Sequence, residues 1–402
     1  MLDTNVHNLK HTDSFCIMPW VSVYTTPDKT VSPCCISVPS NTGKDPDYYK
    51  AEGADLQQMA NTQFMRDLRL DMLNGVKNPA CNNCYKFEQF HESARQGHNT
   101  YHSEYMHTVQ ETQPDGSLPD VKIRYYDFRM DNLCNMKCRS CSAGFSSQWE
   151  VENGQHRDII PTIMDIGMND AEKYSRTEQA HLLDQFREQV PNIKTAYFAG
   201  GEPLMSENHY LLLEEFVRQG RTDIKISYNT NISKFNQFDK DITALWANFE
   251  HKIDVAASVD HYGERAEYIR TGTDWSVIET NLLKLNKMEN IILGFSTVIS
   301  LYNYVTLADY MQYMKNLLNR TPEIGFIKCN SPEYLSARSL SQDIKNKYAG
   351  TIPNVNNIVE WVNAEHSYQK QKTNFKEFTT YTDNVRNTDF CKTFPEIAEM
   401  MS

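Results

Sequence analysis

Apolar and polar residues alternate along the middle of the chain in two periods that follow one another repeatedly. Between residues 121 and 328, short runs of β-branched and aromatic residues are separated by longer stretches whose apolar residues recur every three or four positions. The short runs predict strands and the longer spacing predicts amphipathic helices, which together indicate βα units and a parallel sheet. Six strands are expected, at residues 122–128, 194–199, 223–229, 253–259, 291–298 and 323–328. Helices are expected at 146–152, 170–190, 209–218 and 275–285.

The flanking regions lack this alternation, so three parts of the chain are expected. The first 120 residues are rich in turn formers, and residues 331–402 are polar and predict helices in pieces. Residues 113–119, with two prolines and a glycine, predict a linker. Six strands are fewer than the eight that close a complete barrel. We therefore predict an α/β protein with a cysteine-rich domain at 1–120, an open partial (β/α)6 TIM-like barrel at 121–330 and a helical extension at 331–402.

The chain is acidic, with 40 Lys and Arg against 52 Asp and Glu, a net charge of −12. Sequence-independent binding of nucleic acid depends on Lys and Arg that release counterions, so this composition argues against a nucleic-acid partner. No stretch reaches the ~20 consecutive apolar residues that span a bilayer, and the first residues have no apolar core of secretory type. These features predict a cytoplasmic protein with no membrane partner.

Ten cysteines change this picture, because eight of them fall into two groups. One group is Cys16, Cys34, Cys35, Cys81 and Cys84, and the other is Cys134, Cys138 and Cys141. In a reducing compartment, clustered cysteine is more often metal-binding or catalytic than disulfide-forming. The isolated Cys329 and Cys391 are expected to be small buried hydrophobes.

The second group has the more specific spacing. Cys134, Cys138 and Cys141 lie within eight residues, directly after the first expected strand. Three such thiolates can hold three irons of a cubane cluster and leave the fourth iron free to bind a small molecule. The spacing CxxxCxxC after a strand resembles the signature of the radical S-adenosylmethionine (SAM) superfamily. The resemblance implies that these three cysteines carry a catalytic 4Fe-4S cluster that binds SAM.

A double glycine after the second expected strand agrees with this resemblance, in the segment Ala-Gly-Gly-Glu-Pro-Leu at 199–204. Adjacent glycines let the backbone approach a ligand, and a carboxylate can accept hydrogen bonds from an ammonium group. Taken alone, the segment could equally be a turn with a solvated glutamate. At the barrel face where strand ends converge, it resembles the family segment that contacts the amino group of SAM. This implies that role for Gly200, Gly201 and Glu202.

Polar residues at the ends of two later strands extend the implied SAM site. Segment 257–270 resembles a strand-end pattern of the radical SAM subgroup that carries a SPASM or twitch extension. The resemblance implies that Ser258 faces the ribose and that Arg270 reaches the methionine carboxylate, with Asp260 a weaker candidate. Asn229, in the Tyr-Asn-Thr-Asn that ends the third strand, matches a family segment that lines the SAM site. Singly, such residues are often helix caps or turn formers.

The N-terminal group combines a Cys-x-x-Cys, Cys81 and Cys84, with the more distant Cys16 and Cys34. Four thiolates suit either zinc or an iron–sulfur cluster, and the spacing does not choose between them. The order resembles the short twitch form of the SPASM domain, here placed before the barrel. This implies a second, auxiliary 4Fe-4S cluster on these four residues. Cys35 is the alternative ligand to Cys34, and structural zinc is the alternative to the cluster.

The resemblance implies an enzyme of oxidoreductase type that cleaves SAM reductively to a 5′-deoxyadenosyl radical and abstracts hydrogen from a substrate. The part of the protein is to align the substrate and to exclude competing donors. The leading hypothesis is a peptide or protein side chain as substrate, with an electron donor such as flavodoxin or ferredoxin as partner. The alternatives are a small metabolite or nucleotide as substrate, or a non-catalytic iron–sulfur or zinc scaffold. Tyr262 and Cys329 are weak candidates for managing a proton near the barrel mouth.

Overall fold

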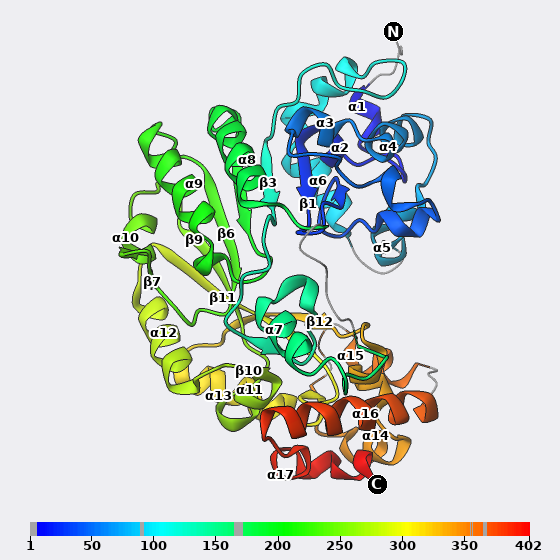
Figure 1. The fold of residues 1–402 in the computed structure, drawn as a ribbon, viewed down its shortest axis with the longest axis vertical. Helices are drawn as coiled ribbons and strands as arrows, with labels where there is room; N and C mark the ends of the chain where they lie inside the picture. The colour runs from blue at the N-terminus through cyan, green and yellow to red at the C-terminus, as the bar shows by residue number, and fades with distance from the viewer. Residues whose placement is uncertain (1–5, 89–91, 165–171, 354, 356, 365–367) are drawn as a thin grey trace.

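Eight strands form one sheet, in the order β12-β11-β9-β6-β5-β3-β1-β2 (Figure 1). The computed structural model describes residues 6–88, 92–164, 172–353, 355, 357–364 and 368–402. Every neighbouring pair is parallel except β1–β2, which is antiparallel and lies at one edge. The strands are β1 (Ser22–Thr25), β2 (Val31–Ser32), β3 (Tyr125–Phe128), β5 (Thr195–Phe198), β6 (Lys225–Thr230), β9 (Ile253–Ser258), β11 (Ile291–Ile299) and β12 (Glu323–Lys328). Two short ribbons pair β4 (Lys137–Cys138) with β10 (Arg270–Thr271) and β7 (Asn236–Gln237) with β8 (Lys240–Asp241).

The six predicted strands are all present, and the α/β class with an open sheet is confirmed. The sheet is larger than predicted, because β1 and β2 come from the first 120 residues. β1 pairs in parallel with β3, and Ser22 lies opposite Tyr125. β1 has only four residues in a turn-rich region, so hydrophobic periodicity does not distinguish it from a loop. The N-terminal region is therefore part of the same sheet, which the sequence did not indicate.

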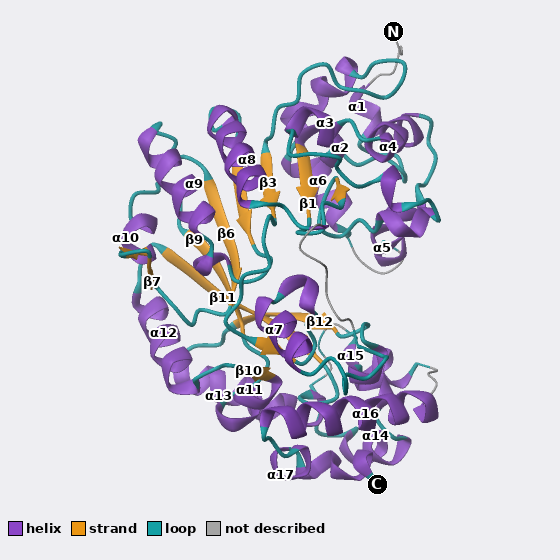
Figure 2. Ribbon diagram, viewed as in Figure 1, coloured by secondary structure: helices purple, strands orange, loops and turns teal. Residues whose placement is uncertain are grey.

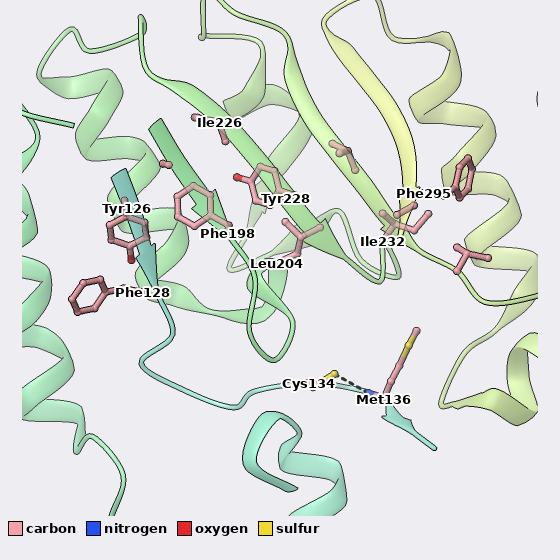
Figure 3. Close-up of a cluster of buried hydrophobic side chains, with 14 of the residues drawn as sticks. Tyr126, Phe128, Cys134, Met136, Phe198, Leu204, Ile226, Tyr228, Ile232 and Phe295 are labelled. Atoms are coloured by element: carbon pink, nitrogen blue, oxygen red, sulfur yellow. Dashed lines mark hydrogen bonds between the residues drawn. The ribbon is translucent and has the colours of Figure 1, made fainter. Parts of the chain in front are cut away.

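Helices cover one face of the sheet. α8 (Arg176–Gln189), α9 (Glu207–Arg218), α10 (Ile242–Trp246), α12 (Trp275–Lys287) and α13 (Leu307–Leu318) lie along its outer side in Figure 1. Tyr126 contacts Phe186 of α8 with ring centroids 4.8 Å apart, and Phe198 contacts His209 of α9 at 4.6 Å. Figure 3 shows Tyr126, Phe198 and Tyr228 along this face. Because side chains alternate along a strand, every second residue of β5, β6 and β9 is buried against these helices.

The predicted helices are present with shifted ends. Residues 209–218 and 275–285 lie in α9 and α12, and 147–152 lie in α7 (Ser147–Gln155), with Ser146 as its N-cap. Within the predicted helix 170–190, α8 begins after Ser175. The Ser175 side chain accepts from the N–H of Glu178, and the Glu178 side chain accepts from the N–H of Ser175. This reciprocal capping box fixes the start of α8. Residues 170 and 171 lie outside the described residues.

The inner face of the sheet is polar, and its residues on β5, β6 and β9 are only partly buried, whereas Asp127 of β3 is buried. It carries Tyr125 and Asp127 on β3, Asn229 on β6 and Ser258 on β9, which alternate with the helix-facing residues. β12 forms one edge and β2 the other, and these two strands are not neighbours in the sheet. The sheet therefore stays open, and its inner face is not filled as it is in a closed barrel.

Two further groups of helices flank the sheet (Figure 2). The N-terminal group, α1 (Val6–Leu9), α2 (Met18–Val21), α3 (Leu56–Ala60), α4 (Gln63–Leu73), α5 (Asn82–Phe87) and α6 (Ala94–Tyr101), lies beside β1. The C-terminal group, α14 (Gln342–Tyr348), α15 (Ile358–Asn363), α16 (Tyr368–Arg386) and α17 (Phe390–Thr393), lies near β12 and α11 (Gly263–Ile269). The C-terminal region is helical, as predicted. Among the described residues, none of the helices combines the length and the apolar character needed to cross a membrane.

Candidate functional site

Residues 129–141, here called the cysteine loop, cross the carboxyl ends of the strands. β3 ends at Phe128, and the chain then runs below the sheet through Cys134 and Met136 (Figure 3). Part of the loop forms β4, which pairs with β10 so that Cys138 lies opposite Arg270. The N–H of Met136 donates to Sγ of Cys134 at 3.4 Å, and Nη1 of Arg270 donates to Sγ of Cys138 at 3.7 Å. The fold thus brings Arg270, from a distant segment, to the cysteine loop.

Two glycines let neighbouring segments touch this loop. A Cβ atom on Gly201 would lie 2.3 Å from the carbonyl oxygen of Leu133, and one on Gly272 would lie 2.7 Å from that of Asn135. Gly200 has a φ of +130°, which L side chains rarely adopt. The double glycine therefore allows the end of β5 to pack directly against the cysteine loop.

The three thiols of the loop lie close enough to influence one another's ionisation. Burial is the largest cause that raises the pKa of each thiol, to about 12 for Cys141. Negative charge on Cys138 and Cys141 raises the pKa of Cys134 further, whereas the Arg270 guanidinium lowers that of Cys138. Buried thiols in such a group become thiolates when a metal compensates their charge, and this donor set fits a cubane cluster.

Glu202 is buried, and both of its carboxylate oxygens accept hydrogen bonds from the protein. Oε1 accepts from the N–H of Leu204 at 3.1 Å and from the hydroxyl of Thr230 at 2.6 Å. Oε2 accepts from the N–H of Asn231 at 2.7 Å. Burial raises the pKa of Glu202 to about 6, and the three hydrogen bonds oppose that rise. The side chain therefore ties the end of β5 to the end of β6, and its charge lies near Cys134.

Three other predicted residues share a small pocket with the loop. Ser258, Asp260 and Arg270 line it together with Met136. Nε of Arg270 lies 2.9 Å from Oδ2 of Asp260, and Oδ1 of Asp260 accepts from the N–H of Val298 at 2.7 Å. Arg270 is thus held between a buried carboxylate and the Cys138 thiol, at the carboxyl end of β9.

The structure places Asn231, rather than the predicted Asn229, in this pocket. Asn229 lies on the inner face of β6, opposite Ala256 of β9. The amide of Asn231 donates to the side-chain oxygen of Asn135 in the cysteine loop at 3.0 Å. Both asparagines belong to the same Tyr-Asn-Thr-Asn segment, in which Asn231 lines the pocket and Asn229 lies on the inner face of the sheet.

Residues that no sequence pattern singled out hold the loop from the C-terminal side. Arg139 is 1% exposed and donates to Asp383 at 2.8 Å and to the carbonyl of Tyr268 at 3.1 Å. Arg386 pairs with Glu152 at 2.8 Å. These partners are separated by 244, 129 and 234 residues. No local motif indicates contacts over such distances.

The N-terminal cysteines converge on a second pocket. Cys16 precedes α2, Cys34 follows β2, Cys81 ends a 3-10 turn (Pro79–Cys81) and Cys84 lies on α5. All four line the same pocket, together with Arg95. Burial is the largest cause that raises the pKa of each thiol, and neighbouring cysteines raise it further for Cys16, Cys34 and Cys81.

Cys35 faces a different part of the molecule. Its exposed side chain interacts with the carboxyl group of Asp127 on the inner face of β3. Asp127 is 1% exposed, and its Oδ1 lies 3.2 Å from Nε of Arg129. Of the two adjacent cysteines, only Cys34 lines the pocket of the other three.

In the described part of the chain, no group of three or more His, Cys, Asp or Glu side chains is arranged to hold a single metal ion. Thiolates around one zinc all bind the same atom, at about 2.3 Å. In a cubane cluster each thiolate binds a different iron, so the thiols need not surround one point.

The isolated candidates have different outcomes. Cys329 is buried, as predicted, whereas Cys391 is exposed and the prediction for it was wrong. The short helix α17 buries the preceding Phe390 and turns Cys391 outward. The ring of Tyr262 stacks on that of Tyr313 with centroids 3.9 Å apart.

No protein-family model matches the chain, and no curated protein matches it. Among solved structures, the chain is similar to anSMEcpe with bound AdoMet, at 17% identity and a TM-score of 0.36, over 64% of this chain and 60% of that one. It is also similar to TYW1 with a lysine-pyruvate adduct bound, at 13% identity and a TM-score of 0.30, over 57% of this chain and 70% of that one. Streptococcus suis SuiB matches at 11% identity and a TM-score of 0.34, over 83% of this chain and 66% of that one. Likenesses this weak carry no argument, so the proposals below rest on the residues of this chain.

Proposed function

We propose that the protein is a radical SAM enzyme whose catalytic 4Fe-4S cluster is held by Cys134, Cys138 and Cys141. The proposal rests on the convergence of these thiols with Glu202 and Arg270 at the carboxyl ends of parallel strands. Sheets of this type bind ligands at that edge. A purely structural metal site needs the thiols but has no use for a carboxylate and a guanidinium beside them.

When bound, the cluster and SAM would supply a 5′-deoxyadenosyl radical that abstracts hydrogen from the substrate. The residues of the chain would bind and orient SAM. An ionised carboxylate has about four acceptor positions, and three of those on Glu202 are occupied by Leu204, Thr230 and Asn231. One position on Oε2 is therefore left for the amino group of SAM. The guanidinium of Arg270 would attract the SAM carboxylate, since charge-assisted hydrogen bonds are the strong ones.

The remaining predicted residues would complete the SAM site. Gly200 and Gly201, which let the end of β5 pack against the cysteine loop, are proposed to contact the amino group of SAM through their backbone. Ser258, which lines the same pocket as Asp260, is proposed to contact the ribose of SAM. Asn229, on the same face of the neighbouring strand β6, is proposed to line the SAM site.

We further propose that Cys16, Cys34, Cys81 and Cys84 hold an auxiliary 4Fe-4S cluster, with Cys35 left out. The four thiols line one pocket, although they come from three segments that are far apart in the sequence. Structural zinc is the alternative. Metal analysis distinguishes the two, because two clusters give about eight irons per chain and one cluster with zinc gives about four irons and one zinc.

The proposed substrate is a peptide or protein side chain that reaches the inner face of the sheet. That face is polar and partly exposed, and the sheet stays open between β12 and β2. A polymer therefore need not be enclosed for one side chain to reach the strand ends, although a small metabolite could enter in the same way. A reductant such as flavodoxin or ferredoxin and a reducing, cytoplasmic location belong to the same proposal, because both cysteine groups must stay free of disulfides.

Anaerobic reconstitution tests this function. The full chain is loaded with iron and sulfide, reduced with dithionite and incubated with SAM, and 5′-deoxyadenosine and methionine are measured by chromatography. The wild type should form both products without added substrate. A variant with Cys134, Cys138 and Cys141 changed to Ala should form neither, and Cys391→Ala, outside both groups, should behave as the wild type. A wild-type protein that holds its iron but forms no 5′-deoxyadenosine would contradict the proposed enzymatic function. The non-catalytic iron–sulfur scaffold would then be the remaining hypothesis.

A further inference from the structure

A buried arginine at the end of α16 touches the cysteine loop. The Arg386 side chain is 1% exposed, and its Nη1 donates to the carbonyl of Lys137, the residue before Cys138, at 3.1 Å. The same nitrogen donates to the hydroxyl of Thr271 at 3.1 Å. Nε and Nη2 bind Glu152, which is 2% exposed, at 3.1 and 2.8 Å. Arg386 therefore joins the loop to α7 through its full guanidinium group.

The other side of Cys138 is also held from outside the loop. The indole N–H of Trp149 donates to the carbonyl of Cys138 at 2.9 Å, and the Arg386 guanidinium lies over the Trp149 ring, 4.2 Å from its centroid. The backbone of Cys138 pairs with Arg270 in the β4–β10 ribbon. The carbonyl groups of Lys137 and of Cys138 itself thus both accept hydrogen bonds from residues outside the loop.

A second anchor follows one residue later. The buried Arg139 donates to Asp383 at 2.8 Å and to Thr388 at 2.9 Å, and also bonds the hydroxyl of Thr382. Its guanidinium lies 3.6 Å from the centroid of the Tyr268 ring. These three partners lie on α16 or directly after it, and a fourth, the carbonyl of Tyr268, lies on α11. The C-terminal region therefore holds the loop at two points.

The N-terminal cysteines show the same arrangement. Arg95 of α6 donates to the carbonyl of Phe15, the residue before Cys16, and its remaining nitrogens bind Glu88 at 2.8 Å. In each cysteine group, then, a buried arginine bonds the carbonyl in front of one cysteine and is neutralised by a glutamate.

We propose that Arg386 is a positioning residue for Cys138, and that the C-terminal region clamps the cysteine loop in the geometry that binds a cluster. This rests on the proposed function, because it takes the loop to be a cluster site. The planar guanidinium of Arg386 bonds a carbonyl and a carboxylate at the same time, which the ammonium group of a lysine does less well.

The test compares Arg386→Gln and Arg386→Lys with Arg265→Gln as a matched control. Arg265 also binds the C-terminal region, through Glu396 at 2.6 Å, but the pair is partly exposed. Each full-length chain is treated with iodoacetamide before reconstitution, and labelling of Cys138 is followed by peptide mass spectrometry. We expect labelling to rise at least about tenfold in Arg386→Gln, because the change removes the guanidinium hydrogen bonds to the Lys137 carbonyl, to Thr271 and to Glu152, which then keeps only its ion pair with Lys137. Arg386→Lys should be intermediate, and Arg265→Gln should change by less than about twofold.

Reconstitution gives a second measurement. Arg386→Gln should lose about four irons per chain, the content of one cluster, and Arg386→Lys should recover part of that loss. Equal labelling and iron in Arg386→Gln and the wild type would overturn the proposal, as would an equal rise in Arg265→Gln. If circular dichroism shows that Arg386→Gln is unfolded, Arg386→Lys decides, and unchanged Cys138 labelling there also overturns it. A wild type without SAM cleavage would contradict the proposed function, while the labelling comparison would still test the clamp.

Discussion

The two cysteine groups form comparable sites by opposite routes. Cys134, Cys138 and Cys141 lie on one loop, whereas Cys16, Cys34 and the neighbouring Cys81 and Cys84 come from three separate segments of the chain. The arginine–glutamate pairs that support the two groups show the opposite pattern of sequence separation. Arg95, which supports the N-terminal group, binds Glu88, seven residues away. Arg386, which supports the loop, binds Glu152, 234 residues away. The group that is local in sequence therefore depends on distant contacts, and the group that is spread out is supported from within its own region.

The largest expected effect separates the two groups by function. Replacing Cys81 and Cys84 with Ala should remove about four irons per chain and leave the substrate-independent formation of 5′-deoxyadenosine in place. Replacing Cys134, Cys138 and Cys141 should remove the other four or so and abolish that reaction. Iron analysis and chromatography measure both. Loss of SAM cleavage in the N-terminal variant would show that the two groups do not work independently.

The next prediction concerns a pair of adjacent cysteines, which serve as each other's control. Cys34→Ala should lower the iron or zinc content of the N-terminal site, because Cys34 lines the four-thiol pocket. Cys35→Ala should leave the metal content unchanged, because Cys35 faces Asp127. Metal analysis after reconstitution decides between them, and the reverse outcome would make Cys35 the ligand.

A smaller effect compares the two glutamates. Glu152→Gln leaves Arg386 buried without its counter-charge, and breaking such a pair costs about 3–5 kcal/mol. Glu88, whose side chain is 14% exposed, holds the buried Arg95. Glu88→Gln should cost about 1.5–3 kcal/mol, the range for hydrogen bonds to charged groups. Urea denaturation of the unloaded chain measures both free energies of unfolding. A larger loss for Glu88→Gln would reverse the comparison.

The smallest effect is a pH dependence next to the N-terminal site. Burial lowers the pKa of His102, just after α6, to about 4, and the neighbouring His98 lowers it further. Above about pH 6.5, the unfolded value, His102 is neutral in both states. As the pH falls from there towards 4, only the unfolded chain takes up the proton. The free energy of unfolding therefore decreases by up to about 1.4 kcal/mol per pH unit.

Denaturation at pH 6.5 and pH 5.5 measures this loss. His209 and His261, with pKa values of about 3, impose a similar loss elsewhere in the chain. The useful comparison is therefore between the wild type and His102→Gln, in which the loss should be smaller by up to about 1.4 kcal/mol. An unchanged loss would mean that His102 is protonated in the folded state.

The sequence predicted the parts of the fold that local patterns encode. All six βα strands have β-branched or aromatic runs, and the cysteine spacing and the double glycine mark the ends of the first two. β1 was not predicted, because a strand of four residues is too short to show a hydrophobic period. Arg139 and Arg386 were not predicted either, because they bind a carbonyl, carboxylates and hydroxyls more than 100 residues away. Every residue has a backbone carbonyl, so the sequence of the accepting segment does not indicate such a contact.

The separation between Arg386 and Lys137 has a consequence for the order of events on the ribosome. Arg386 is made 249 residues after Lys137, which takes about 12–50 s at typical elongation rates. Arg95 follows Phe15 by 80 residues, or about 4–16 s. The N-terminal thiols can therefore be gathered while translation is still in progress. The cysteine loop has to wait for the C-terminal helix, and its three thiols stay unclamped until Arg386 has been made.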